Sequence, residues 1–121
     1  MVRSIGFVGI RTDRFAETVG LYRDLLGMRP VLVRPGATWF EASDGTAIHV
    51  YGPDDADHDF FGVGPVVGYV VEDFDATRTA MIAAGIGFIG EPQRDGRTAW
   101  NHFRGPDGNV HELMGPDRAT E

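Results

Sequence analysis

The side chains in this chain that are best suited to chemistry are histidines and carboxylates, because the chain holds no cysteine. The 4 His and 18 Asp+Glu residues leave acid–base chemistry and metal binding open. A thiolate zinc site, an iron–sulfur cluster, a disulfide framework and a cysteine nucleophile are excluded. Any metal must therefore be held by His, Asp or Glu. His49, His102 and Glu112 stand out, since each lies in a predicted strand and on the strand face that is expected to line a cavity.

An internal repeat relates these three residues to one another. Val-Gly-x5-Phe-x2-Thr occurs at 8–18 and again at 67–77, and Phe-x3-Asp-Gly-x6-Gly-Pro occurs at 40–53 and again at 103–116. The second match makes His49 equivalent to Glu112, and Trp39 equivalent to His102. A duplication is the economical explanation of both matches.

Hydrophobic periodicity predicts the same order of elements, strand–helix–strand–strand–strand, in both copies. In the first copy, Asp13 is the expected N-cap of a helix that buries Phe15, Val19, Tyr22 and Leu26 and ends at Gly27. The predicted strands of the first copy are 5–11, 29–34, 38–42 and 46–51. The second copy is predicted to have strands 66–71, 87–89, 98–103 and 110–114, a helix over 75–84 and a turn at Pro106-Asp107-Gly108.

Strand alternation separates the side chains into two faces. Phe40 and Phe103 are expected beneath the helices, in a core with Met28 and Phe74. The other face is expected to carry Trp39, His49, Tyr51, Trp100, His102, Val110, Glu112 and Met114. The predicted fold class is α+β, with two βαβββ modules forming paired curved mixed sheets around a central cavity. A carboxylate facing His49 from Glu112 would raise the pKa of that imidazole.

The length of 121 residues predicts one domain. Its expected parts are module one at 4–53, a linker at 54–64, module two at 65–116 and a tail at 117–121. We expect His58 in the linker to be solvated, and Phe60-Phe61 to form an apolar patch that contributes to a dimer interface. His111 is expected to be structural.

The net charge of −7, with no cluster of Lys or Arg, argues against a nucleic-acid partner. Every apolar run is much shorter than a membrane helix requires. The first residues lack the apolar stretch of a signal peptide. We therefore expect a cytoplasmic protein that binds neither nucleic acid nor membrane.

Two segments carry a resemblance to a known family: the helix Leu21-Tyr22-Arg23-Asp24-Leu25-Leu26-Gly27-Met28 and the closing segment at 103–113. Together with the paired modules, they resemble the vicinal oxygen chelate superfamily, which includes glyoxalase I, methylmalonyl-CoA epimerase, extradiol dioxygenases and bleomycin-resistance proteins. The resemblance covers roughly positions 4 to 116. It implies the glyoxalase/bleomycin-resistance/dioxygenase-like fold, a homodimer and a divalent metal held by His, Glu or Gln on the first and last strands of each module.

Only part of that implied metal site is present. Phe7 and Val66 stand where the family often has histidines, whereas His49 and Glu112 occupy the two remaining positions. Because catalytic metal sites typically use three protein ligands, we expect a cavity without a metal. The alternative is one divalent ion (Zn, Ni, Mn or Fe) on His49 and Glu112, with His102 as a third ligand.

The resemblance leaves three functions open. The first is a metal-independent protein that binds and sequesters a bulky, cationic organic ligand, as bleomycin-resistance proteins do. Its ligand would be bound by Phe7, Trp39, Tyr51, Val66, Trp100 and His102, with Arg11 or Arg104 near the mouth of the cavity. The second is a glyoxalase-like lyase, isomerase or dioxygenase that uses Glu112 and His49 as catalytic residues. The third is a structural or regulatory fold with a vestigial cavity.

Overall fold

The computed structural model describes residues 1–62, 65–106 and 108–119. The chain divides into two compact units. The first unit is Phe7–Val66, and the second unit combines Met1–Gly6 with Val67–Glu121. The predicted module boundaries at 53 and 65 stay predictions. Part of the predicted linker (63–64), the turn residue Asp107 and the last two residues of the tail lie outside the described residues.

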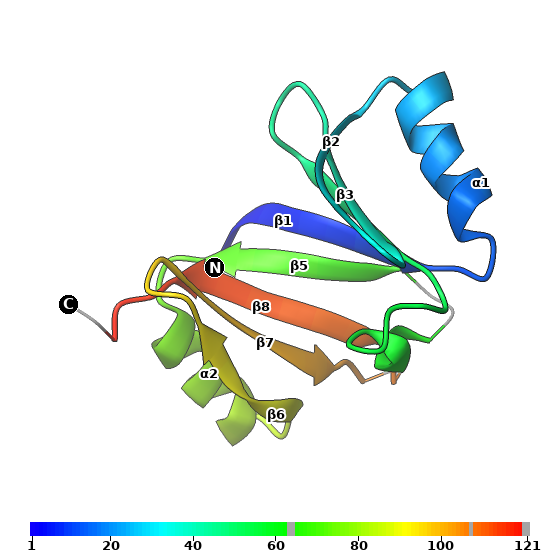
Figure 1. The fold of residues 1–121 in the computed structure, drawn as a ribbon. Coiled ribbons are helices and arrows are strands. Elements are labelled where there is room, and N and C mark those ends of the chain that lie inside the picture. The colour runs from blue at the N-terminus through cyan, green and yellow to red at the C-terminus, as the bar shows by residue number, and fades with distance from the viewer. Residues whose placement is uncertain (63–64, 107, 120–121) are drawn as a thin grey trace. The chain divides into compact units, whose positions relative to one another are not determined.

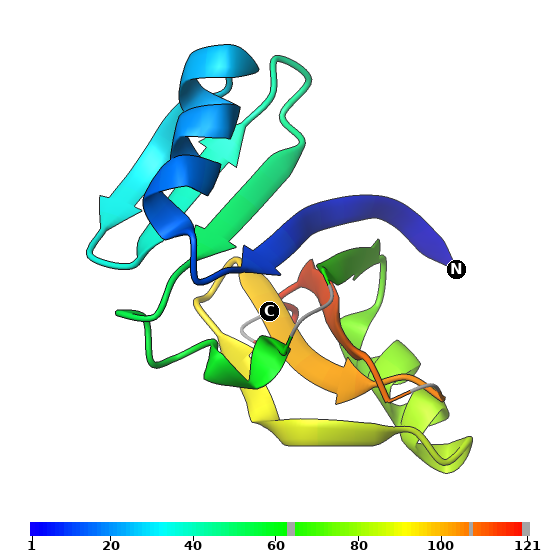
Figure 2. The same ribbon diagram turned by 90° about the vertical axis from the view of Figure 1, so that its right-hand side faces the viewer.

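The first unit has a four-stranded mixed sheet with one helix on it (Figure 1). Strand order is β2-β3-β4-β1, with β1 parallel to β4 and the other pairs antiparallel. Helix α1 lies on one face of the sheet, as both ribbon views show (Figure 1, Figure 2). The elements are β1 (Val2–Arg11), α1 (Phe15–Gly20) with a π-helical turn (Leu21–Leu25), β2 (Arg29–Arg34), β3 (Ala37–Glu41), β4 (Ala47–Tyr51) and a short 3-10 helix (Asp59–Phe61).

The second unit repeats this plan with strand order β5-β8-β7-β6. Here β5 is parallel to β8, and the other pairs are antiparallel. Its elements are β5 (Val66–Val71), α2 (Phe74–Ala83), β6 (Gly87–Arg94), β7 (Thr98–Arg104) and β8 (Val110–Pro116). The predicted α+β class and the βαβββ order of both copies are therefore confirmed.

Each unit has its own hydrophobic core beneath its helix, at equivalent positions of the repeat. Phe40 is fully buried with Val19 and Val50, and Met28 packs against them. In the second unit, Phe103 and Phe74 are buried together with Val71, Ala99 and Leu113. The predicted core positions Phe40, Phe103, Met28 and Phe74 are thus confirmed, because strand alternation correctly assigned the faces.

Both ends of the first helix differ from the prediction. The N-cap is Arg14 without a side-chain cap, not Asp13. The last turn is π-helical, with Leu26 N–H bonded to the carbonyl of Leu21 at 2.9 Å. Because this bond spans five residues instead of four, the wider turn changes the direction of the following side chains. Tyr22 still packs on the core, but Leu26 is 60% exposed.

Strand β6 is longer than the predicted 87–89, because the chain continues through an irregularity between Ile89 and Gln93. The side-chain amide of Asn101 donates to the carbonyls of Ile89 and Gly90 at 3.2 and 3.3 Å. This buried side chain thus supplies hydrogen bonds to the backbone at the start of the irregularity.

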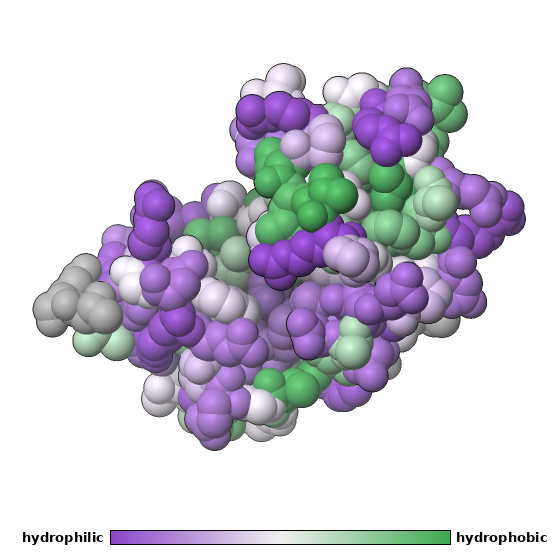
Figure 3. All heavy atoms as spheres, in the orientation of Figure 1, coloured by the Kyte–Doolittle hydropathy of each residue, from purple (hydrophilic) through white to green (hydrophobic). Residues whose placement is uncertain are grey.

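Several apolar side chains remain on the surface of the first unit. Val31 and Val33 on the edge strand β2 are exposed, and Figure 3 shows hydrophobic atoms gathered over β2 and β3, with hydrophilic residues around them. In the part of the chain that the structure describes, no helix has the length and apolar character needed to cross a membrane.

The fully buried Phe40 gives a direct test of the first core. Replacing it with alanine should lower the free energy of unfolding by about 3–5 kcal/mol, through lost transfer energy and a cavity. Leu25→Ala, at a position that is 79% exposed, is the matched control and should change it by less than about 0.5 kcal/mol. Denaturant unfolding measures both values. Equal losses in the two variants would contradict the assigned core.

Candidate functional site

The duplicated positions pair directly across strands in both units. Trp39 lies opposite His49 on β3 and β4, and His102 lies opposite Glu112 on β7 and β8. The same structural position therefore holds an aromatic pair in one unit and a histidine–carboxylate pair in the other. Side chains directly opposite one another in a sheet are close enough to interact.

In the first unit, His49 is enclosed by two aromatic rings. Its imidazole stacks on Trp39 with ring centroids 4.2 Å apart and planes 6° from parallel. On β1, the ring of Phe7 is 4.6 Å away at 21°. Phe7 and Trp39 were both predicted as ligand-binding residues, and the structure places both against His49.

The hydroxyl of Tyr51 connects this stack by hydrogen bonds. Trp39 Nε1 donates to it at 3.1 Å, and it lies 3.2 Å from His49 Nδ1. An indole N–H only donates, so the Tyr51 hydroxyl is the acceptor of the bond from Trp39, and the same hydroxyl can donate to His49 Nδ1 in the tautomer that carries its proton on Nε2.

Burial, together with the nearby charge of His58, lowers the pKa of His49 from 6.5 to about 4. The prediction that the pKa of His49 is raised is therefore wrong. Removing an imidazolium from water is unfavourable, and this desolvation is the largest cause of the shift. His49 is a neutral residue at physiological pH.

His58 was predicted to be solvated, and this prediction is wrong. Its ring stacks on Tyr51 with centroids 3.9 Å apart at 18°, and its Nδ1 lies 3.0 Å from an Asp55 oxygen. Arg11 also contacts Asp55, at 3.3 Å. Phe61 is buried against Tyr51, so it does not belong to the exposed apolar patch expected at Phe60-Phe61.

The loop that carries Asp54, Asp55 and His58 is held in place by close packing against the backbone of Gly36. Gly36 has φ +76°, and a Cβ at this position would lie 2.6 Å from the backbone nitrogen of Asp55. Gly52 N–H donates to the carbonyl of Gly36 at 2.8 Å. Only glycine fits here without strain, so the turn after β2 holds the loop after β4 in place.

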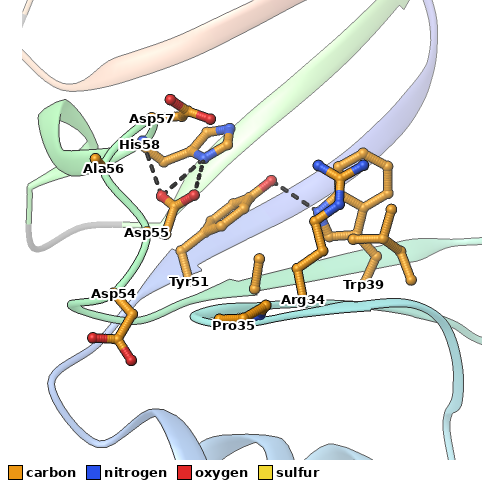
Figure 4. Close-up of a pocket in the computed structure, with 11 residues that line it drawn as sticks. Arg34, Pro35, Trp39, Tyr51, Asp54, Asp55, Ala56, Asp57 and His58 are labelled. Carbon is orange, nitrogen blue, oxygen red and sulfur yellow. Dashed lines mark hydrogen bonds and ion pairs between the residues drawn. The ribbon is translucent and has the colours of Figure 1, made fainter.

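These elements enclose a pocket of about 340 Å³ within the first unit. Figure 4 shows Trp39 and Tyr51 joined by their hydrogen bond, with His58 held beside Asp55. Leu32, Pro35 and Ala37 add apolar surface to the lining. A small cavity that combines apolar walls with a few polar groups is typical of small-molecule sites.

Two of the pocket's lining residues, Trp39 and Tyr51, are among the ligand-binding residues predicted from the sequence, and its charged residues and His58 are not. The missed residues are Arg34, Asp54, Asp55, Asp57 and His58. The signal available was the density of charge in Asp54-Asp55-Ala56-Asp57-His58, directly after a strand that carries two predicted site residues. That segment was interpreted as a linker because it lies between the two copies.

In the second unit, His102 and Glu112 form a largely buried pair. His102 Nε2 lies 2.9 Å from Glu112 Oε1, and the two side chains are 13% and 7% exposed. Trp100 lies on the same strand as His102, and Met114 lies opposite Trp100. A buried histidine–carboxylate contact of this length can hold or transfer a proton.

The remaining predicted residues have other surroundings. Val66 is fully buried, and Arg104 donates to the carbonyl of Gly108 at 3.0 Å. His111 stacks on Phe103 and lies near the Tyr69 hydroxyl, as expected for a structural residue. Within residues 1–62, 65–106 and 108–119, no three His, Asp or Glu side chains come together as metal ligands do.

Comparison with known families decides the identity of the fold. The family model of the Glyoxalase/Bleomycin resistance protein/Dioxygenase superfamily matches residues 4–113. The chain belongs to this superfamily. A comparison of this superfamily member with curated proteins found no match.

Solved structures share its fold at low sequence identity. The Mn(II)-bound glyoxalase from Novosphingobium aromaticivorans superposes with TM-score 0.75 at 23% identity, over 94% of this chain and 39% of that chain. Methylmalonyl-CoA epimerase from Mycobacterium tuberculosis gives 0.70 at 22%, over 98% and 91%. A variant of the Streptomyces coelicolor epimerase, in complex with 2-nitronate-propionyl-CoA, gives 0.68 at 20%, over 97% and 99%.

The lowered pKa of His49 predicts a pH-dependent stability of this superfamily member. Between pH 6.5 and 4 the unfolded chain binds a proton at His49 that the folded chain does not, so stability falls as the pH falls. From pH 7 to pH 5 the loss should be about 2 kcal/mol. His49→Phe, which retains a ring between Phe7 and Trp39, should remove this part of the loss. Denaturant unfolding at both pH values tests it, and the same pH dependence in both proteins would contradict the assignment.

Proposed function

We propose that this superfamily member binds a small aromatic molecule in the pocket of the first unit and does so without a metal. The bound molecule carries a positive charge. The observation that supports this most is the composition of the pocket, whose aromatic side chains Trp39, Tyr51 and His58 lie beside three aspartates.

The aromatic side chains give the pocket preorganised walls. Tyr51 is 2% exposed and has His58 stacked on its ring, while its hydroxyl accepts from Trp39. Side chains held in this way lose little conformational freedom when a ligand arrives, so less of the contact energy is lost to ordering. Flat and cationic molecules gain from such rings through stacking and cation–π attraction.

Carboxylates supply the preference for a positive charge. Asp55 is already engaged by Arg11 and His58. Asp54 and Asp57 also line the pocket, and neither forms an ion pair with any residue that the structure describes. The overall charge of −7 adds long-range attraction for a cationic ligand.

This binding does not require a metal. His49 and Glu112, which stand at two of the family's metal-ligand positions, both contact other side chains. His49 Nδ1 lies against the Tyr51 hydroxyl, and Glu112 contacts His102. The homodimer and the cytoplasmic location are proposals that rest on the family resemblance and on the sequence.

Tryptophan fluorescence tests binding in the pocket, because the chain has 2 Trp residues and only Trp39 lines the cavity. In a Trp100→Phe variant, N-benzylpyridinium should quench the emission of Trp39 with a saturable dependence on concentration. In the matched Trp39→Phe variant, Trp100 should show only weak, linear quenching. Saturable quenching of Trp100 alone, or of neither tryptophan, would contradict the proposed site.

A second candidate function is supported by the buried His102–Glu112 contact of 2.9 Å. In this alternative the protein is a glyoxalase/dioxygenase-like enzyme, a lyase, isomerase or oxygenase, that uses His49 and Glu112, with or without a divalent metal. A neutral His49 suits a proton-accepting role. Glu112, held by His102, suits the transfer of a proton to or from a substrate carbon or oxygen.

Metal analysis tests the metal-free proposal against the metal-dependent form of the enzyme. For protein purified without chelator, we expect far less than one metal ion per chain, and no loss of thermal stability when EDTA is added, because no metal contributes to folding. His49→Ala and Glu112→Ala should leave the metal content unchanged. A stoichiometric content of Zn, Ni, Mn or Fe that both substitutions abolish would overturn the metal-free proposal and favour the enzyme.

A further inference from the structure

The pocket of the first unit has a positively charged group as well as its aspartates. Arg34 is the last residue of β2 and lines the cavity. Within the described part of the chain, its guanidinium forms no ion pair, although three aspartates line the same cavity. The charges of the two groups are therefore not cancelled by contact with each other.

The opposite charges lie at different ends of the cavity. Figure 4 shows Arg34 beside Trp39 on one side, and Asp57 and His58 on the other, with Tyr51 and Pro35 between them. Asp54 lies on the same side as Asp57, with its carboxylate directed away from Tyr51. The two ends also come from different elements, since Arg34 is the last residue of the edge strand β2 and the aspartates follow β4. The close contact between Gly36 and the backbone of Asp55 holds the turn after β2 against the loop after β4.

We propose that the ligand is an aromatic zwitterion, with its amine at the Asp57 end and a carboxylate at the Arg34 end. This inference rests on the proposed function and names its ligand class. The ring lies along the Tyr51–Trp39 wall. A guanidinium recognises a carboxylate through two parallel N–H donors, and the aspartates accept from the ammonium group.

The chemistry of the pocket discriminates among simpler ligands. An aromatic cation satisfies the aspartates but leaves Arg34 facing a neutral ring edge. An aromatic anion satisfies Arg34 but meets the negative potential of Asp54 and Asp57. Only a molecule that carries both charges is complementary to both ends.

Three matched probes test this proposal by isothermal titration calorimetry at low salt: 4-(aminomethyl)benzoate, benzylamine and benzoate. They share one benzene ring and differ only in charged groups. The zwitterion should bind about three- to tenfold more tightly than benzylamine, as expected for an ion pair at the rim of a pocket. Benzoate should bind most weakly. The advantage of the zwitterion should decrease with added salt.

Two variants assign that advantage to Arg34. Arg34→Gln should abolish the preference, so that 4-(aminomethyl)benzoate and benzylamine bind with about equal affinity. Arg29→Gln is the matched control, because Arg29 lies on the same strand, pairs with Glu41 and does not line the pocket. It should preserve the preference for the zwitterion.

The outcomes separate this proposal from the one on which it rests. Equal affinity for benzylamine and the zwitterion, or an unchanged preference in Arg34→Gln, would overturn the zwitterion assignment and leave the aromatic cation site standing. No binding of any probe, together with no saturable quenching of Trp39 by N-benzylpyridinium, would overturn the pocket itself.

Discussion

The site of the first unit depends on the buried hydroxyl of Tyr51. A hydroxyl removed from water must find hydrogen-bond partners within the protein, and here it accepts from Trp39 and faces His49 Nδ1. These bonds fix the directions of the Trp39 indole and the His49 ring. The other side of the same residue supports His58, and His58 in turn holds Asp55. One phenol thus orders both the aromatic wall and the acidic loop.

The internal repeat explains why the two units differ in chemistry while sharing a scaffold. The equivalent cross-strand pairs are Trp39–His49 and His102–Glu112. Both occupy the strand face opposite the helix, and neither pair belongs to the cores around Phe40 and Phe103. In the first unit this pair is aromatic and contains a neutral histidine, whereas in the second unit it is a histidine–carboxylate pair. Two copies of one fold can thus carry different chemistry at the same structural position.

Features that depend on hydrophobic periodicity could be predicted from the sequence. Features that depend on contacts between separate elements could not. Alternation on β3 and β4 placed Trp39, His49 and Tyr51 on one face, because the side-chain period of a strand is two. The exposed Leu26 was not predicted, since a π-helical turn has no simple sequence signal. His58 and Asp55 were missed for a different reason. Their roles come from contacts with Tyr51 and Arg11, the latter distant in sequence, and the acidity of the segment suggested a solvated linker.

The central claim, that the ligand binds on the Trp39–Tyr51 wall, is tested most directly by the two indole N–H signals in a ¹H–¹⁵N correlation spectrum. The indole of Trp39 donates to Tyr51, so its signal reports on that wall, and Trp100 reports on the second unit. During titration with 4-(aminomethyl)benzoate, the Trp39 signal should shift to saturation and the Trp100 signal should stay in place. Saturable movement of Trp100 with Trp39 unchanged would contradict the account and place binding at the second unit.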